Sequence, residues 1–255
     1  QNLEIFSEIK EDFIRIKKFS ELRDIAIFGS EIINQIPDLR VVEIEASTGC
    51  FRDVGCSFCT EVFDEREYRG QKDIYDEIKA FRDLGCEYFR LGKQTCFYSY
   101  KDSNPGEIKK LLKPISKLKL KVLHIDNVNP VKVNEEITKL IVMYCTEGNV
   151  AAFGVESFDR DVIKANNLNS NPETTMNAIR IINKYGAKRG NNGMPYLLPG
   201  INILFGLNKE SKKTHEENMF WLNKILEENL LIRRINIRQV VPFKGTKIYE
   251  EVGNK

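Results

Sequence analysis

Three cysteines lie within ten residues of one another, and their spacing points to metal chemistry. They are Cys50, Cys56 and Cys59 in the segment TGCFRDVGCSFCTE, which gives the spacing C-x5-C-x2-C. Three thiolates can bind three irons of a 4Fe–4S cluster and leave the fourth iron open to another ligand. They can also bind zinc or stay unliganded, because spacing only narrows the ligand chemistry. His124 and His215 are distant in sequence and offer no nearby extra ligand.

The other three cysteines, Cys86, Cys96 and Cys145, are scattered along the chain. We interpret them as small buried hydrophobic residues, which free cysteines commonly are. Cys96 alone follows a strand-end motif, so it is also a candidate functional thiol. Disulfide frameworks belong mainly to small secreted domains, whereas this chain has 255 residues and clustered cysteines. The sequence therefore predicts a reducing compartment and a cytoplasmic location.

The composition is that of an ordinary globular protein. The chain has 39 basic and 37 acidic residues, a formal net charge of +2, and 42% hydrophobic residues. These values exclude a disordered charged chain and provide no global electrostatic attraction to nucleic acid or membrane. The longest apolar runs are too short to cross a bilayer, and the first residues show no export signal. We expect no membrane association, and the oligomeric state stays open.

Six short, nearly continuous apolar runs predict the buried strands of a parallel sheet. Helical patterns separate them, so we expect successive right-handed βαβ units around one sheet. Pro37 precedes the first run, and residues 1–40 are predicted to form an N-terminal helical extension to a domain spanning residues 41–255. The six runs are residues 41–46, 88–91, 122–125, 150–155, 201–205 and 235–241.

Several residues predict helix ends. Asn104 and Asn171 each precede a proline, as an N-cap followed by proline at the first helical position would. Gly186 predicts the end of the helix that Asn171 begins. Thr214, with Glu217 three residues later, predicts a capping box.

The cysteine triplet after the first strand, Phe58 before the last cysteine, and six βα units together resemble the radical S-adenosylmethionine (SAM) superfamily. The resemblance covers about residues 40–250 and implies an α/β fold, a partial (βα)6 barrel. The family's usual spacing is C-x3-C-x2-C, so this loop is two residues longer. Three further segments are similar to strand motifs of methylthiotransferase-like and elongator-like members: FRLGKQT, FGVESFDRDVIKANN and GINILFGLNKES. HIDNVNP, RGNNGMPYLLPG and RRINIRQ resemble archaeal radical SAM proteins that carry a C-terminal helix-hairpin-helix.

The resemblance implies roles for individual residues. Cys50, Cys56 and Cys59 would ligate one 4Fe–4S cluster, and SAM would chelate its fourth iron. Phe58 would pack near the adenine of SAM. Further SAM contacts are expected from Gly92 and Gln94 after the second strand, Glu156 and Ser157 after the fourth, Ile203 and Gly206 on the fifth, and Arg189 toward a SAM or substrate carboxylate.

Several of these residues also have purely structural interpretations. Gly92 and Gly206 are equally typical of turns at strand ends, and Glu156 of a salt bridge there. Asp126, Asn127 and Asn129 follow the third strand, where both substrate binding and Asx turns are expected. With Cys96, they are the candidate catalytic or substrate-contacting residues.

The sequence thus predicts a radical SAM enzyme that cleaves SAM to a 5′-deoxyadenosyl radical, which abstracts hydrogen from a substrate. A non-catalytic iron–sulfur electron carrier and a zinc-bound module are the alternatives. We expect one cluster, because residues 1–49 contain no cysteine, and an external flavodoxin-like or ferredoxin-like electron donor.

The substrate class rests on resemblance and on local charge. The motifs are most similar to radical SAM enzymes that act on RNA, so we expect an RNA nucleoside, with a small molecule or peptide as the alternative. Basic residues at 109–121 and at Arg233, Arg234 and Arg238 are candidate phosphate contacts. A solvated lysine face explains the first of these clusters equally well.

Overall fold

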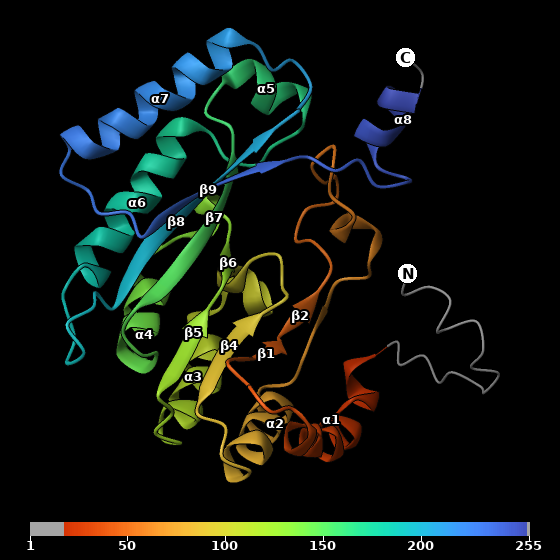
Figure 1. The fold of residues 1–255 in the computed structure, drawn as a ribbon, viewed down its shortest axis with the longest axis vertical. Coiled ribbons are helices and arrows are strands. Elements are labelled where there is room, and N and C mark those ends of the chain that lie inside the picture. The colour runs from red at the N-terminus through yellow and green to blue at the C-terminus, as the bar shows by residue number, and fades with distance from the viewer. Residues whose placement is uncertain (1–17, 254–255) are drawn as a thin grey trace.

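The structure, a computed structural model, describes residues 18–253 of the chain. Two ladders of parallel strands form its centre (Figure 1). Asp126 separates them, and the N–H of Ala152 donates to the carbonyl of Asp126 at 3.1 Å, so the second ladder continues the first. The first ladder has the order β1 (Val42–Glu45), β4 (Tyr88–Gly92), β5 (Val122–Ile125), and the second β6 (Asn127–Val128), β7 (Asn149–Glu156), β8 (Leu197–Phe205), β9 (Arg234–Gln239).

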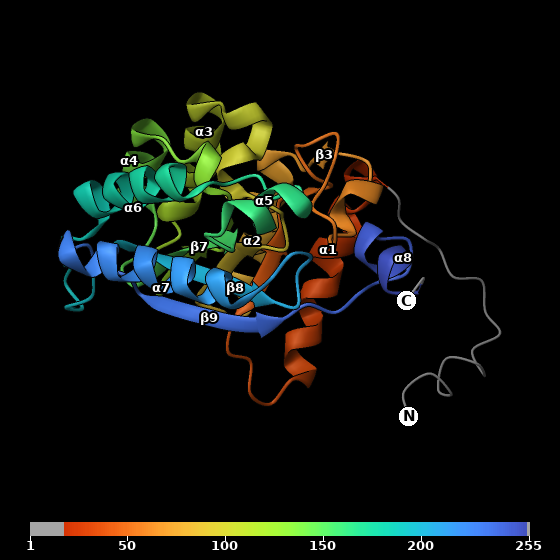
Figure 2. The same cartoon turned by 90° about the horizontal axis from the view of Figure 1, so that it is seen from above.

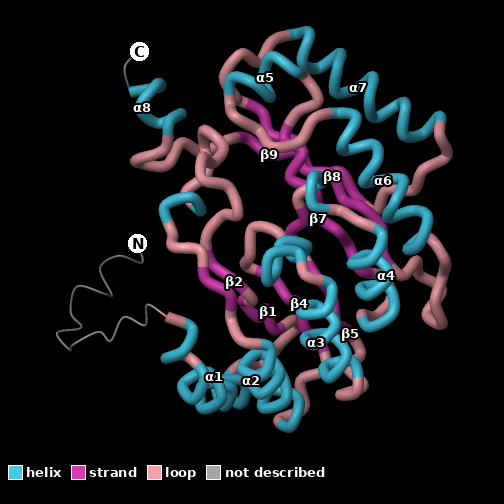
Figure 3. Tube along the Cα trace, turned by 180° about the vertical axis from the view of Figure 1, so that it is seen from behind, coloured by secondary structure: helices cyan, strands magenta, loops and turns pink. Residues whose placement is uncertain are grey.

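Helices cover one face of these strands. Figure 1 looks onto the uncovered face, and Figure 3, from behind, looks onto the helices, while Figure 2 shows them from above. The ion pair between Arg23 and Asp76, at 2.7 Å, helps to hold the first helix against the second. The helices are α1 (Arg23–Gly29), α2 (Gln71–Asp83), α3 (Pro105–Ser116), α4 (Glu135–Tyr144), α5 (Arg160–Ala165), α6 (Pro172–Gly186), α7 (Lys212–Glu227) and α8 (Lys247–Gly253).

Side chains alternate between the two faces of the strands, as the period of two requires. On β1, Val42 and Ile44 are buried in the core beneath the helices, while Glu43 is exposed and Glu45 half-buried. The same alternation places His124 of β5 on the uncovered face. We call this face, opposite the helices, the open face of the sheet. It carries polar and charged side chains, whereas the helix face carries the main hydrophobic core.

The predicted strands all form, although β8 begins at Leu197, four residues before the predicted run. Both predicted asparagine caps are present: the N–H of Gly106 donates to Asn104 at 2.9 Å, and that of Thr174 to Asn171 at 2.9 Å. The predicted capping box at Thr214 is wrong in register. Helix α7 begins at Lys212, and Thr214 is its third residue, accepting a hydrogen bond from the N-cap residue at 3.0 Å.

The predicted N-terminal extension is only partly described. Residues 1–17 lie outside the described residues, and Phe19–Gln35 form a succession of short helices around α1. Within residues 18–253, no helix is long and apolar enough to cross a membrane.

Candidate functional site

The three clustered cysteines lie in one long loop, residues 49–66, which we call the cysteine loop. Two short antiparallel strands, β2 (Ser47–Thr48) and β3 (Glu67–Tyr68), close its base directly after β1. Gly49 has φ of +69°, and a Cβ atom there would lie 2.7 Å from the carbonyl oxygen of Asp64. Only glycine tolerates both this backbone conformation and this close approach, so Gly49 allows the loop to close.

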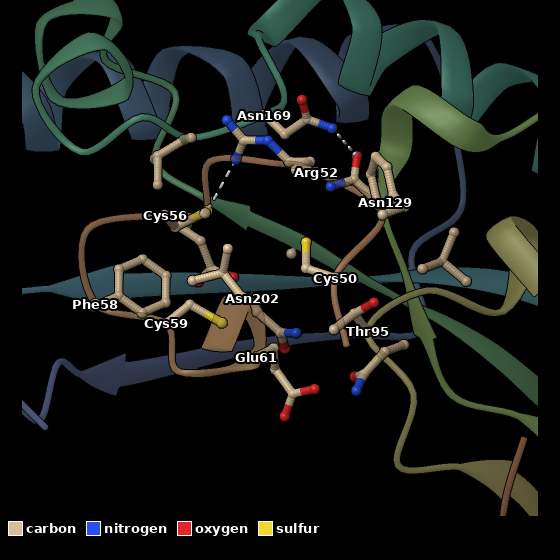
Figure 4. A pocket seen from close by; sticks show the side chains of 18 of the residues that line it. Cys50, Arg52, Cys56, Phe58, Cys59, Glu61, Thr95, Asn129, Asn169 and Asn202 are labelled. Atoms are coloured by element: carbon tan, nitrogen blue, oxygen red, sulfur yellow. Dashed lines mark hydrogen bonds between the residues drawn. The ribbon is translucent and has the colours of Figure 1, made fainter. Parts of the chain in front are cut away.

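The cysteine loop covers a cavity of about 240 Å³ at the carboxyl ends of the parallel strands. Figure 4 shows Cys50, Cys56 and Cys59 around it, each of them half-buried and none in a disulfide. The remaining walls come from three parts of the sheet and from the loop after α5. The polar lining includes Arg52, Glu61, Thr95, Asn127, Asn129, Glu156, Asn169 and Asn202.

Hydrogen bonds tie the cysteine loop to the residues that follow α5. The side chain of Arg52 donates to the sulfur of Cys56 at 3.4 Å and to the carbonyl of Asn167 at 2.8 Å. The Asn167 amide donates to the carbonyls of Val54 and Gly55, at 3.2 and 2.9 Å. The segment between the first two cysteines is therefore held at Arg52, Val54 and Gly55.

Asn166 connects the cysteine loop to two other elements. Its side chain is fully buried, and its oxygen accepts from the hydroxyl of Ser57 at 2.8 Å and from the N–H of Asn208 at 3.1 Å. Its amide group donates to the carbonyls of Val162 and Asn208, at 2.8 and 2.9 Å. The C-terminal helix adds a further contact, because the N–H of Ile248 donates to the carbonyl of Ser57 at 2.9 Å.

Burial shifts the pKa values of several side chains that line the cavity. It raises the pKa of the Cys56 thiol to about 11, against the lowering effect of Arg52, and it also raises the pKa of Cys59. Burial likewise raises the pKa of Glu156 to about 7, an effect that the Arg238 charge opposes. In the protein alone burial therefore disfavours the charged forms of these groups, and bound iron would compensate the charge of the thiolates.

The donor set fits an iron–sulfur cluster. Among residues 18–253, no three His, Cys, Asp or Glu side chains converge as ligands of a single metal ion. A 4Fe–4S cluster does not need convergence, because each thiolate binds a different iron. Three thiols arranged around one cavity are the arrangement such a cluster requires.

The structure brings some of the predicted site residues to the cavity. Phe58, Asn127 and Glu156 line it with the three cysteines. Asp126 lies just outside, half-buried and 4.0 Å from Arg90.

Other predicted residues are buried away from the cavity. Gln94 donates to the carbonyl of Leu91 at 2.7 Å, and its own side-chain oxygen is buried without a partner. Ser157 accepts from the N–H of Asp159 at 3.1 Å, as in a turn. Cys96 is completely buried and accepts from the N–H of Asn129 at 3.2 Å.

Ile203 belongs to the hydrophobic core, and its neighbour Asn202 lines the cavity instead. The two glycines do not line it. The place of a Cβ atom on Gly92 is taken by the side chain of Glu43, and Gly206, with φ of +89°, forms a turn whose N–H donates to Glu210.

Arg189 lies at the opposite end of the strands from the cysteines. It precedes β8, and its guanidinium donates to the carbonyl of Gly193 at 2.5 Å. Loops that enter parallel strands lie at their amino ends, whereas the cavity is at their carboxyl ends. This corrects the expectation that Arg189 holds a carboxylate in the same site as the cysteines.

Several cavity residues were missed from the sequence. Thr95 lies in the loop after β4, where only its position at the carboxyl end of a strand was a signal, and Asn169 lies in the loop after α5. Asn129 lines the cavity beside Asn127, where the sequence placed it as a candidate substrate contact. Asn202 had a clearer signal, because it is the polar residue in a strand whose apolar and polar residues alternate. Asn166 and Ser57, which support the cysteine loop without lining the cavity, had no signal, because they lie 109 positions apart in the sequence.

The fold and the site define an α/β partial barrel with a three-thiol cavity at the carboxyl ends of its strands. Residues 44–203 match the radical SAM superfamily. The chain belongs to this superfamily, as its cysteine loop and strand motifs predict.

Two archaeal relatives share much of the sequence. An uncharacterized protein of Methanocaldococcus jannaschii is 49% identical over 262 residues, which cover 94% of this chain and 48% of that protein. An uncharacterized protein of Archaeoglobus fulgidus is 45% identical over 252 residues, which cover 92% of this chain and 47% of that protein. The chain therefore spans about half the length of the curated relatives it matches.

Solved structures of radical SAM enzymes share the fold. The methyltransferase TsrM of Kitasatospora setae, with cobalamin and a [4Fe-4S] cluster bound, has a TM-score of 0.64 at 15% identity, over 84% of this chain and 39% of that chain. Methylornithine synthase PylB has a TM-score of 0.56 at 16% identity, over 90% of this chain and 62% of that chain. At these identities the likeness shows the fold alone, and it confirms the predicted radical SAM type of α/β barrel.

Proposed function

We propose that this chain is the catalytic barrel of a radical SAM enzyme, with one 4Fe–4S cluster on Cys50, Cys56 and Cys59. The observation that carries the proposal is the cavity that all three thiols line at the carboxyl ends of the strands. When bound there, the cluster supplies the electron that cleaves SAM to methionine and a 5′-deoxyadenosyl radical.

The residues of the chain have distinct tasks in this proposal. Phe58, immediately before Cys59, offers an aromatic face to the adenine of SAM. Glu156, Asn127 and Asn202 offer polar groups to SAM or to the substrate from three strands of the sheet. The walls of the cavity keep bulk water and other molecules away from a reactive intermediate.

The test uses anaerobically purified protein, with iron and sulfide measured first and SAM cleavage under dithionite second. We expect about four irons per chain, and both 5′-deoxyadenosine and methionine as products. Zinc without iron would contradict the cluster assignment. A cluster without any 5′-deoxyadenosine would favour an electron carrier, and about eight irons would contradict the single cluster.

We further propose an RNA nucleoside as substrate and an external flavodoxin-like or ferredoxin-like electron donor. The support for RNA is the resemblance of the strand motifs and the presence of basic residues near the sheet edge. Comparing RNA nucleosides and small metabolites from cells with and without the gene tests the substrate class. An unchanged nucleoside profile with a changed metabolite would favour the small-molecule alternative.

A further inference from the structure

The structure separates the two basic clusters of the sequence. Lys109, Lys110 and Lys113 are exposed on α3, which packs on the helix side of the sheet, away from the cavity. Arg234 and Arg238 belong instead to β9, the strand beside β8. Only this second cluster lies close to the site.

Both arginines of β9 lie on the open face of the sheet. Asn236 donates to the side chain of Asn202 at 2.9 Å, and Asn202 lines the cavity, so both asparagines are on that face. Arg234 and Arg238 lie two residues to either side of Asn236 and share its face by the alternation of a strand. Their Cα atoms are separated by about 13 Å, four steps of about 3.3 Å.

Gly200 leaves room for the side chain of Arg234 to lie across the sheet. A Cβ atom on Gly200 would lie 3.3 Å from Cγ and 3.5 Å from Nε of Arg234, and 3.0 Å from a methyl carbon of Val150. Arg234 therefore lies over β8 in the direction of β7, toward the middle of the open face. It does not extend away from the edge of the sheet.

Arg238 lies on the side of the cavity. Its charge acts on the Glu156 carboxyl, which lines the cavity, and partly opposes the rise in the Glu156 pKa that burial causes. Within the described part of the chain, neither Arg234 nor Arg238 has a carboxylate within 4.0 Å, whereas Arg90 on the same face pairs with Asp126. Two guanidinium groups thus remain available next to the cavity.

We propose that Arg234 and Arg238 form an anion subsite on the open face, which holds an oxyanion of the substrate, a phosphate or a carboxylate. The planar guanidinium fork matches both groups through paired hydrogen bonds. This inference rests on the proposed function, because it takes the cavity as the place of reaction. It adds that the substrate carries a negative group on the β9 side of its reacting atom.

The test is the rate at which phenylglyoxal modifies each arginine in the anaerobic, cluster-loaded protein, followed by mass spectrometry of peptides. The probes are inorganic phosphate and acetate, each against chloride at the same ionic strength. We expect phosphate to slow modification of Arg234 and Arg238 about fivefold when present at about four times its dissociation constant. Arg189, which lies at the other end of the strands, serves as the internal control and keeps its rate.

The two anions distinguish the source of the oxyanion. Protection by phosphate alone assigns a phosphate group, and protection by both assigns an oxyanion subsite that also accepts carboxylates. Equal rates in phosphate, acetate and chloride would overturn the proposal. SAM cleavage is measured in the same samples, so that protection without cleavage contradicts the proposed reaction and leaves the subsite standing.

A pair of variants provides a second measurement. The double variant Arg234→Gln, Arg238→Gln should weaken phosphate binding in calorimetry at least about tenfold, a change of 1.4 kcal/mol. Its matched control, Arg189→Gln, should leave phosphate binding unchanged. SAM cleavage should stay at the wild-type level in the Arg189→Gln control, because Arg189 lies at the opposite end of the strands from the cysteines. Equal phosphate affinity in the double variant and the control would refute the subsite.

Discussion

Ser57 and Asn166 should stabilise the cysteine loop as a coupled pair. Both side chains are buried, and their hydrogen bond of 2.8 Å joins the loop to the end of α5. The perturbation is a double-mutant cycle of Ser57→Ala, Asn166→Ala and the combined variant. Coupling is expected because each single change leaves the other partner without its hydrogen bond.

The structure sets the size of each effect. Asn166→Ala leaves the Ser57 hydroxyl and both backbone groups of Asn208 without their side-chain partner, whereas the carbonyl of Val162 keeps the Asn166 N–H at 3.0 Å. An unsatisfied buried group costs about 1–3 kcal/mol, and Asn208 is only half-buried, so we expect a loss of about 2–4 kcal/mol. Ser57→Ala should cost about 1 kcal/mol, because the Asn166 oxygen still accepts from Asn208. The double variant should fall short of the sum by about 1 kcal/mol.

The assay is urea unfolding of the anaerobic, cluster-loaded protein, with iron per chain and the spectrum of the reduced cluster as additional readouts. Asn183→Ala is the matched control. Its amide donates to Ile179 and Leu231 at 3.0 and 3.1 Å, and it contacts no part of the cysteine loop. Asn166→Ala should lower both stability and iron content, and the control should lower stability alone. Additivity within about 0.3 kcal/mol, or equal iron in the two variants, would refute the coupling.

Three further results are expected. Replacing any one of the three loop cysteines by serine should abolish SAM cleavage and reduce the iron content. The control variant Cys86→Ala should keep about four irons per chain, and iron loss in that variant would contradict a single cluster on the loop. Burial lowers the pKa of His124, so its neutral form stabilises the fold at pH values above its ordinary pKa, and this stability is lost as pH falls through the lowered value. The melting temperature of the wild type should therefore drop more steeply below about pH 6.5 than that of His124→Gln, and parallel curves would refute this role. Filter binding of bulk tRNA should weaken with rising salt, because the logarithm of the binding constant falls linearly with the logarithm of the salt concentration, more steeply the more phosphates are neutralised. An absence of salt-sensitive binding by this chain and by any longer natural form would remove RNA as the substrate class.

Most of the strands were predictable because they are short apolar runs that the helices bury. Strand β9 was predicted from its apolar residues although none of its residues is buried. The start of β8 was missed for a physical reason. Pro199 and Gly200 lie within it, and these residue types are unusual inside strands. The carbonyl of Pro199 nevertheless accepts from the N–H of Arg233 at 2.8 Å, and the small Gly200 makes room for Arg234. Both exceptions thus have identifiable partners in the structure.

The site was predictable where a residue is adjacent to the cysteines and less so elsewhere. The resemblance located the fifth-strand motif but selected Ile203, whose side chain is on the helix face, in place of Asn202. The alternation of apolar and polar residues in the segment INIL indicates the correct residue, since the apolar residues of a half-buried strand face the core and the polar Asn202 faces the other side. The contacts of Asn166 and α8 with the loop could not be predicted, because they join segments far apart in sequence.

The long spacing between the first two cysteines has a structural counterpart. The residues between them are held by Arg52, which donates to the carbonyl of Asn167, and by the Asn167 amide, which donates to Val54 and Gly55. Asn167 adopts φ of +51°, a conformation that asparagine tolerates better than most residues. A loop lengthened without such partners would pay more conformational entropy when it orders around a cluster. Because the C-x5-C segment is already clamped before any metal binds, its extra length is compatible with the same three-iron ligation that the shorter spacing serves.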